Sequence, residues 1–124
     1  MGHGMDILIL SPRTELWTEL APVFKARGAS LRMMPDLDSG LESLREKKAV
    51  LAVLDLGMDA ETLRKAVISI LTIDVMTHTT AVSAMSEEEF HDAMEGLGML
   101  MSLPAQPAPA DIEHLMDTLA SLSV

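Results

Sequence analysis

Six consecutive apolar residues at 49–54 constrain the fold of this chain more than any other segment. The run ends on a single acid, Asp55, which Leu56, Gly57 and Met58 follow. An aliphatic run of this length is typical of a strand that is buried on both faces of a parallel sheet. The carboxyl ends of such strands are where open α/β sheets place their ligands and reactive groups. Asp55 is therefore the first candidate functional residue.

Strand-like segments alternate with helical patterns along the chain. Strands are predicted at five places, residues 6–10, 30–34, 49–54, 79–84 and 97–103, and Gly98 interrupts the last. A helix is predicted after each strand, and the first is expected to begin near Pro12 with Ser11 as its cap. This alternation predicts an α/β fold, a three-layer αβα sandwich around a five-stranded parallel sheet. The common order of such a flavodoxin-like sheet is 2-1-3-4-5.

Capping and turn residues predict several helix ends. Gly28 ends the first helix, Asp59 caps the third, and Ser86 with Glu89 fits a capping box for the fourth. Pro22 is expected to kink or divide the first helix. Four helices carry apolar residues at helical spacing on an inward face. These residues are Leu16, Leu20, Val23 and Phe24 in the first, Leu37, Leu41 and Leu44 in the second, Leu63, Val67, Ile70 and Leu71 in the third, and Ile112, Leu115, Met116, Leu119 and Leu122 in the last.

Length and composition set further limits. A chain of 124 residues is one domain, and we expect residues 1–5 to be a disordered or tag-derived N-terminus and residues 6–124 the single folded domain. No apolar segment approaches the roughly 20 residues that a membrane-spanning helix needs, and no secretory signal is recognisable. The absence of cysteine excludes disulfides and thiolate metal sites. A cytoplasmic protein is expected.

The acidic balance of the chain excludes one class of partner. The net charge is −10, and such a surface repels the phosphate backbone of nucleic acids. Two phenylalanines and one tryptophan leave little for base stacking. Eleven methionines either fill the core in place of aromatic residues or form an adaptable surface for protein partners.

No motif of a common enzyme class is present. The chain lacks a nucleophile elbow, a Walker loop and a glycine-rich dinucleotide turn. Its four histidines, His3, His78, His91 and His114, include no pair at the i, i+4 spacing of a helical metal site. We therefore expect no catalytic residues, no metal centre and no resident cofactor.

The order and spacing of these segments resemble the receiver domain of bacterial two-component response regulators, over about residues 6–122. Asp55 matches the phospho-accepting aspartate of that family, with Met58 three residues later as in its D-x-x-M pattern. Ser83, followed by Ala84, matches the switch Ser/Thr-Ala at the end of strand four.

Two further positions carry the resemblance near the fifth strand. Pro104 matches the proline that follows the family's lysine, usually through a cis peptide bond. Gly98 matches a glycine that is frequent in the fifth strand of receivers.

The chain departs from the receiver pattern at the positions that hold cations. Receivers place two acids after the first strand to help bind Mg²⁺, and Ser11 and Pro12 stand there. Leu103 replaces the lysine that pairs with the phosphoryl group. One carboxylate and a hydroxyl would hold Mg²⁺ weakly, and phosphoryl transfer needs such cations. Asp55 is then expected to remain for a structural reason, bonded to nearby backbone amides.

The resemblance and these departures together predict a stand-alone, degenerate receiver: a signalling or protein-interaction module that is not phosphorylated in the usual Mg²⁺-dependent way. Receivers dock partners or dimerise through the face formed by helix four, strand five and helix five. The residues expected on that candidate interface are Phe90, Met94, Met99, Met101 and His114.

Two other readings remain open at this stage. One is a functional phospho-accepting response regulator that uses Asp55. The other is a small α/β ligand-binding protein or enzyme that uses the same crevice. An interaction module predicts a crevice closed by Leu103 and Pro12, whereas a ligand binder predicts an open pocket beside Asp55 and Ser83.

Overall fold

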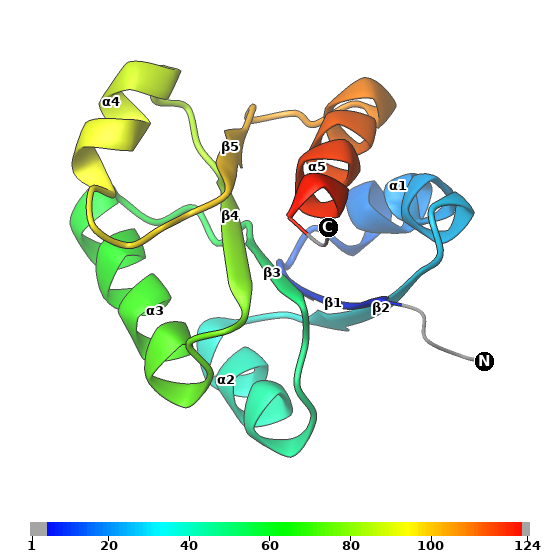
Figure 1. The fold of residues 1–124 in the computed structure, drawn as a ribbon, viewed down its shortest axis with the longest axis horizontal. Coiled ribbons are helices and arrows are strands. Elements are labelled where there is room, and N and C mark those ends of the chain that lie inside the picture. The colour runs from blue at the N-terminus through cyan, green and yellow to red at the C-terminus, as the bar shows by residue number, and fades with distance from the viewer. Residues whose placement is uncertain (1–4, 123–124) are drawn as a thin grey trace.

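A five-stranded parallel sheet forms the middle layer of the computed structural model, which describes residues 5–122 (Figure 1). The strands are β1 (Met5–Leu10), β2 (Ala29–Met34), β3 (Leu51–Leu54), β4 (His78–Val82) and β5 (Met101–Leu103). Their order in the sheet is β2-β1-β3-β4-β5, and every neighbouring pair is parallel. The fold class and strand order predicted from the sequence are confirmed.

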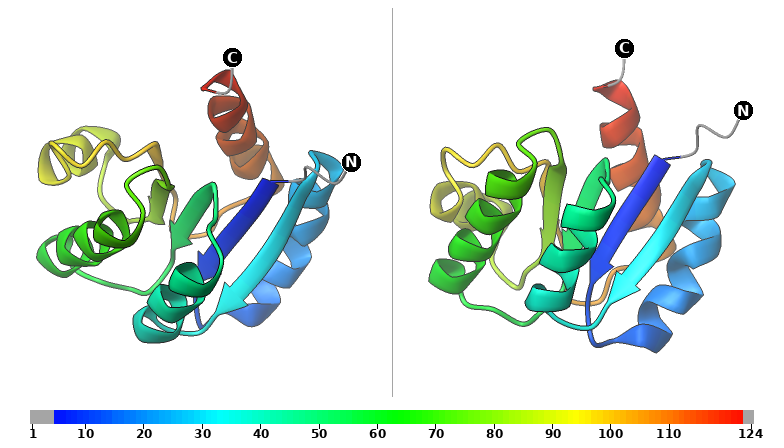
Figure 2. Two further views of the ribbon diagram at one scale, coloured as in Figure 1. Left: turned by 60° about the horizontal axis from the view of Figure 1, so that its bottom comes forward. Right: turned by 90° about the horizontal axis from the view of Figure 1, so that it is seen from below.

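Helices cover both faces of this sheet, as the views in Figure 2 show. The first face is covered by α1 (Thr14–Ala26) and α5 (Pro109–Ser121), and the second by α2 (Leu37–Glu46), α3 (Ala60–Ile73) and α4 (Glu87–Ala93). No helix within residues 5–122 is long and apolar enough to cross a membrane.

The central strand β3 is buried on both faces, as its continuous apolar sequence predicts. Leu51 and Val53 pack into the core beneath α1 and α5, and Ala52 and Leu54 into the core beneath α2, α3 and α4. Successive side chains of a strand point to opposite faces, so a strand with helices on both sides needs apolar residues at every position.

The pairing of β1 with β3 determines which residues meet at the carboxyl edge of the sheet. Leu10 lies opposite Leu54, and the Asp55 amide donates to the Leu10 carbonyl at 2.8 Å. Ser11 and Asp55 therefore leave the sheet side by side. The sequence predicted this juxtaposition from the strand order.

Several predicted helix ends are confirmed. The Asp59 carboxylate accepts from the Thr62 amide at 2.8 Å, and this hydrogen bond lowers the pKa of Asp59 below its usual range. Ser86 and Glu89 form the reciprocal capping box. Gly28 ends α1 with a φ of +86°, which glycine adopts without strain. Helix α1 runs through Pro22 without dividing.

Other boundaries differ from the sequence predictions. Met5 belongs to β1, so the strand begins one residue early, whereas the rest of the predicted N-terminal tail lies outside the described residues. Helix α1 begins at Thr14 and Ser11 does not cap it, because the Ser11 hydroxyl is bonded elsewhere. Leu122, expected inside, follows the end of α5 and is 52% exposed.

Strand β5 is much shorter than the predicted segment 97–103. Pairing with β4 starts only after the Leu100 amide donates to the Thr79 carbonyl at 2.7 Å. Gly96 and Gly98 have φ values of +88° and +66°, and these turns carry the chain from α4 to the sheet edge. Gly98 therefore lies in a loop and does not belong to the strand.

Helix α2 packs closely against β1 at Gly40. A Cβ atom at residue 40 would lie 2.0 Å from Cδ2 of the buried Leu10. Replacing glycine by alanine inside an exposed helix usually stabilises a protein by about 1 kcal/mol. Here we predict that Gly40→Ala lowers the free energy of unfolding by about 1–3 kcal/mol, because the core is overpacked.

Urea denaturation followed by circular dichroism measures this change. Truncating Leu10 in the same chain removes the clash, so the double variant is expected to lose less than the sum of the two single variants. Additive losses, or a stabilising Gly40→Ala change, would show that α2 can move away from β1.

Candidate functional site

The carboxyl edge of the sheet holds one buried acid. Asp55 follows β3 directly and is 6% exposed, and Ser11, which follows β1, is also buried. A carboxylate that is removed from water must be neutralised or hydrogen-bonded, because its charged form is otherwise strongly disfavoured. The contacts of Asp55 therefore decide what this site can do.

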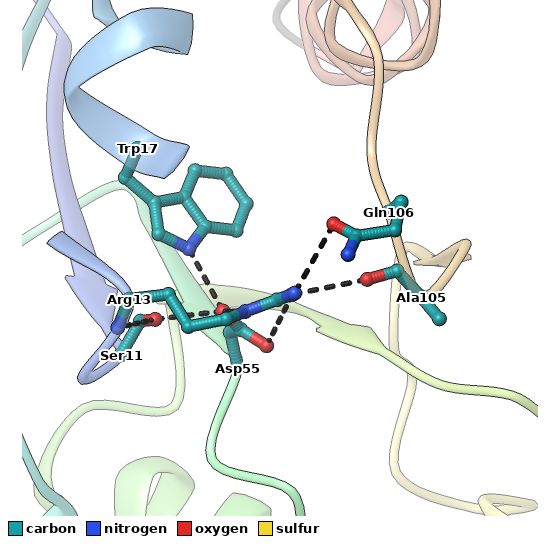
Figure 3. A network of polar contacts seen from close by, with 6 residues as sticks. All are labelled: Ser11, Arg13, Trp17, Asp55, Ala105 and Gln106. Carbon is teal, nitrogen blue, oxygen red and sulfur yellow. Dashed lines mark hydrogen bonds and ion pairs between the residues drawn. The ribbon is translucent and has the colours of Figure 1, made fainter. Parts of the chain in front are cut away.

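Three side chains satisfy the Asp55 carboxylate, as Figure 3 shows. Its Oδ2 accepts from Ser11 Oγ at 2.6 Å, Arg13 Nε at 2.8 Å and Trp17 Nε1 at 2.9 Å. Its Oδ1 accepts from Arg13 Nη2 at 2.9 Å. A carboxylate offers about four acceptor positions, two on each oxygen, so Oδ2 is fully used and Oδ1 accepts one bond.

Arg13 is the cation of the site. Its guanidinium binds both oxygens of Asp55, a planar two-point arrangement that is the strongest form of carboxylate recognition by a side chain. The same group donates to the Ala105 carbonyl at 3.1 Å and to Gln106 Oε1 at 3.3 Å. Arg13 thus connects the loop after β1, the end of β3 and the loop before α5 (Figure 3).

Local structure orients Arg13 toward Asp55. The Ser11 hydroxyl donates to Asp55 and accepts from the Arg13 amide at 2.9 Å, so it links the backbone of residue 13 to the carboxylate. Trp17, one turn into α1, is fully buried and packs beside Phe24 with ring centroids 6.4 Å apart. Its indole N–H needs an acceptor when buried, and Asp55 supplies it.

The cation in this site was not predicted from the sequence. The sequence patterns predicted a lone anion that faces neutral side chains and is bonded to backbone amides, whereas the carboxylate oxygens of Asp55 are bonded to three side chains, and one of these is charged. A usable signal was present. Arg13 is the only lysine or arginine in the five described loops that follow the strands at the carboxyl edge.

Trp17 was missed for a different reason. The helical spacing pointed to Leu16 and Val23 as inward residues of α1, but both are only partly buried, and Trp17 is fully buried with Phe24. The inward face is therefore rotated toward Trp17. An indole donor near the start of the first helix is a signal that a buried acceptor lies close by.

For an interaction module, we expected Leu103 and Pro12 to close the crevice. They do not close it. Leu103 is 1% exposed and packs into the core beneath α1 and α5, while Pro12 is exposed. A hollow of about 570 Å³ lies beside Asp55 and is also lined by Ser83. Pro104 is exposed, and its peptide bond is trans, like the others in residues 5–122, so the expected cis bond is absent.

Ser83 lies one residue after β4 and is half-buried. Its hydroxyl accepts from the Met85 amide at 3.1 Å, and its own amide donates to the Leu103 carbonyl at 2.9 Å. The predicted switch residue therefore shares the hollow with Asp55, and its hydroxyl takes part in a local turn.

The magnesium ion of a receiver does not fit this donor set. Mg²⁺ demands near-octahedral oxygen ligands at about 2.1 Å. Both oxygens of Asp55 already accept hydrogen bonds, and the Arg13 guanidinium stands 2.8 Å from one of them. A dication would have to displace a positive group that is itself held by neighbouring carbonyls. Within residues 5–122, no cluster of three His, Asp or Glu side chains is arranged to hold a metal ion.

The predicted partner interface is only partly at the surface. Phe90 and Met94 are 5% and 4% exposed and pack into the core beneath α4, although both also line a hollow at this face. Met99 and Met101 are half-buried, and His114 is exposed on α5. The amphipathic spacing of α4 could not show which of its faces turns toward α3.

A hollow of about 350 Å³ separates α4 from the segment that leads into β5. Its rim carries three exposed polar residues, Glu87, His91 and Glu95, and its wall includes Met99 and Met101. No lysine or arginine lines it. The nearby Arg64 donates to the Ala93 and Glu95 carbonyls and fixes the end of α4.

The strand order and the helices on both faces define a flavodoxin-like fold, with a buried aspartate after β3. No protein-family model matches the sequence, and no curated protein matches it. Solved structures do match. The chemotaxis response regulator CheY4 of Vibrio cholerae superposes with a TM-score of 0.79 at 11% identity, over 94% of this chain and 98% of that one.

Two further structures show the same likeness. The receiver domain of a sensor histidine kinase from Pseudomonas aeruginosa, with magnesium coordinated in its active-site cleft, has a TM-score of 0.72 at 14% identity and covers 95% of this chain and 98% of its own. A Burkholderia pseudomallei response regulator with a phosphorylated aspartic acid has a TM-score of 0.73 at 14% identity and covers 96% and 70%. The chain has the fold of response-regulator receiver domains.

The sole tryptophan of the chain reports directly on the Asp55 site. We predict that Arg13→Gln lowers the free energy of unfolding by about 1–3 kcal/mol, because Asp55 stays buried without its charged partner. The same change should alter the emission of Trp17. Chemical denaturation and fluorescence spectroscopy measure the two effects.

Arg27→Gln is the matched control, since Arg27 forms ion pairs with the exposed Glu113 and Asp117. It is expected to cost less and to leave the emission of Trp17 unchanged. Equal losses in the two variants, with unchanged emission in both, would contradict the central place of Arg13.

Proposed function

We propose that this chain is a receiver-like signalling module that acts by contact with other proteins and is not an enzyme. Its acceptor-like aspartate is neutralised by an arginine of the same chain and is not switched by Mg²⁺-dependent phosphorylation. The observation that carries the proposal is the two-point contact of Arg13 with Asp55. Because the fold resembles that of bacterial response-regulator receiver domains, we also propose that the protein acts in the bacterial cytoplasm.

The chemistry of phosphoryl transfer supports this proposal. An acceptor carboxylate attacks through a free oxygen lone pair, while cations neutralise the charge of the moving group. Here both Asp55 oxygens are engaged, and Oδ2 alone accepts three hydrogen bonds. The arginine that would have to turn toward the phosphoryl group is held by Ala105 and Gln106.

The open hollow beside Asp55 favours a second candidate function, the binding of a small ligand. Its only acids are Asp55 and Asp59. The first is paired with Arg13 and the second caps α3, so neither is free to act as an acid or base. Ligand binding is therefore the weaker of the two candidates, and the engagement of both acids argues against an acid–base catalytic role.

Incubation with acetyl phosphate and millimolar Mg²⁺, followed by intact-protein mass spectrometry, tests the proposal. We predict no phosphate adduct, because Oδ2 of Asp55 accepts three hydrogen bonds and the Arg13 guanidinium contacts both carboxylate oxygens, where a metal ion would have to bind. The Burkholderia pseudomallei response regulator, whose aspartic acid is phosphorylated in its structure, is the positive control. An adduct that forms on this chain and disappears in Asp55→Asn would overturn the proposal.

The hollow between α4 and β5 is the proposed contact surface for a partner protein. It combines an acidic rim, Glu87 and Glu95, with the side chains of Met99 and Met101. Methionine adapts to varied apolar partners, and an acidic rim selects basic residues around them. Phe90 and Met94 are 5% and 4% exposed and also line this hollow, so they form its apolar floor.

Charge reversal on the rim tests this surface. We predict that Glu87→Lys with Glu95→Lys abolishes the capture of the partner from a lysate of the source organism, because the rim then repels basic residues. Glu42→Lys with Glu46→Lys on the exposed side of α2 changes the net charge equally and should leave capture intact. Quantitative mass spectrometry of the captured proteins measures the difference. Equal capture by both double variants would contradict the assignment.

A further inference from the structure

Exposed apolar side chains gather at the amino edge of the sheet, opposite the Asp55 site. In the part of the chain that the structure describes, five large apolar side chains are exposed, and four of them lie where strands begin or helix α5 ends. These are Val50 at 38%, Val75 at 75%, Met76 at 77% and Leu122 at 52%. Clustered apolar exposure of this kind marks interaction sites. Leu119 near the end of α5 and Met5 at the start of β1 line the same hollow at this edge.

The loop that presents Val75 and Met76 is firmly anchored. Asp74 Oδ1 accepts from the Met76 amide at 2.9 Å, and the Asp74 amide donates to the Ile70 carbonyl at 3.0 Å. On the other side, the buried Thr77 donates its hydroxyl to the Ala49 carbonyl at 2.9 Å. The turn therefore holds two apolar side chains in water, an arrangement that is unfavourable until another surface covers them.

A hollow of about 380 Å³ lies next to this loop. Its apolar lining comes from four separate segments of the chain and consists of Met5, Ala49, Val50, Met76 and Leu119. The charged or titratable lining consists of Asp6, Lys48, Asp74 and His78. A protruding apolar pair and an apolar hollow thus stand side by side on one face, which we call the amino-edge face.

The charges around the amino-edge face indicate what kind of partner binds there. The chain as a whole carries −10, so most surfaces of two copies repel each other. Around this hollow, however, Lys47 and Lys48 balance Asp6 and Asp74, and Lys47 Nζ lies 3.6 Å from Asp6 Oδ2. Within residues 5–122, Lys48 and Asp74 take part in no ion pair. A self-complementary face needs such a pair of opposite, unpaired charges.

We propose that the amino-edge face binds a second copy of this chain in a two-fold symmetric dimer. Val75 and Met76 of each copy enter the hollow of the other, and Lys48 of each copy faces Asp74 of the other. The dimer leaves both the Asp55 site and the hollow between α4 and β5 uncovered. It therefore does not rest on the proposed function and stands if that function fails.

Sedimentation velocity over a range of protein concentrations tests the dimer. The unmodified chain is expected to approach twice its monomer mass of 13.4 kDa as the concentration rises. Met76→Glu places a charge in the apolar contact and should keep the protein monomeric. Ile68→Glu, which alters the fifth exposed apolar residue on α3, is the matched control and should still dimerise.

Lys48→Glu extends the test to the charged contact. It should weaken the dimer, whereas Lys25→Glu on the exposed side of α1 changes the net charge equally and should weaken it less. Trp17 emission confirms that each variant is folded. Two outcomes overturn the proposal: a chain that stays monomeric at every concentration, or a dimer that tolerates Met76→Glu and Lys48→Glu as well as it tolerates the two controls.

Discussion

The ion pair between Arg13 and Asp55 is the interaction on which the rest of this site depends. A buried carboxylate is strongly disfavoured without a positive partner and hydrogen-bond donors. This fold supplies both from its first strand-to-helix segment, through Ser11, Arg13 and Trp17. Because Arg13 also binds the loop after β5, one charged group joins three parts of the carboxyl edge.

An internal cation changes what a receiver fold can do. A metal ion can bind and leave, whereas an arginine that is part of the chain keeps the charge of the site constant. On our proposal, the carboxyl edge then contributes to stability and other surfaces bind the partners. The hollow between α4 and β5 and the amino-edge face lie on separate parts of the molecule, so partner binding and self-association do not compete in this account.

Much of this architecture follows from the order of apolar segments. The alternation of strands and helices predicts the sheet order, and the order places Ser11 beside Asp55. The direction of a loop side chain does not follow from this order. The periodicity of apolar residues does not predict that Arg13 turns toward Asp55. The sequence does show that Arg13 is the only basic residue in the described loops at this edge.

The pattern of apolar residues also did not predict which side chains of α4 are buried or how long β5 is. Phe90 lies on the short helix α4 and Met94 directly follows it. Contact with α3 and the Arg64 hydrogen bonds at the end of α4 determine which face turns inward. Strand β5 is an edge strand of three residues, and the glycine turns before it decide where pairing starts. Both features depend on contacts between distant parts of the chain, so the local sequence determines them only in part.

A crystal structure of the protein soaked with beryllofluoride and Mg²⁺ tests the central claim most directly. Beryllofluoride mimics a phosphoryl group on an acceptor aspartate. The account predicts unchanged density at Asp55, with the Arg13 guanidinium still bound to both carboxylate oxygens. Density for beryllofluoride on Asp55, beside an octahedral metal ion and with Arg13 displaced, would contradict it.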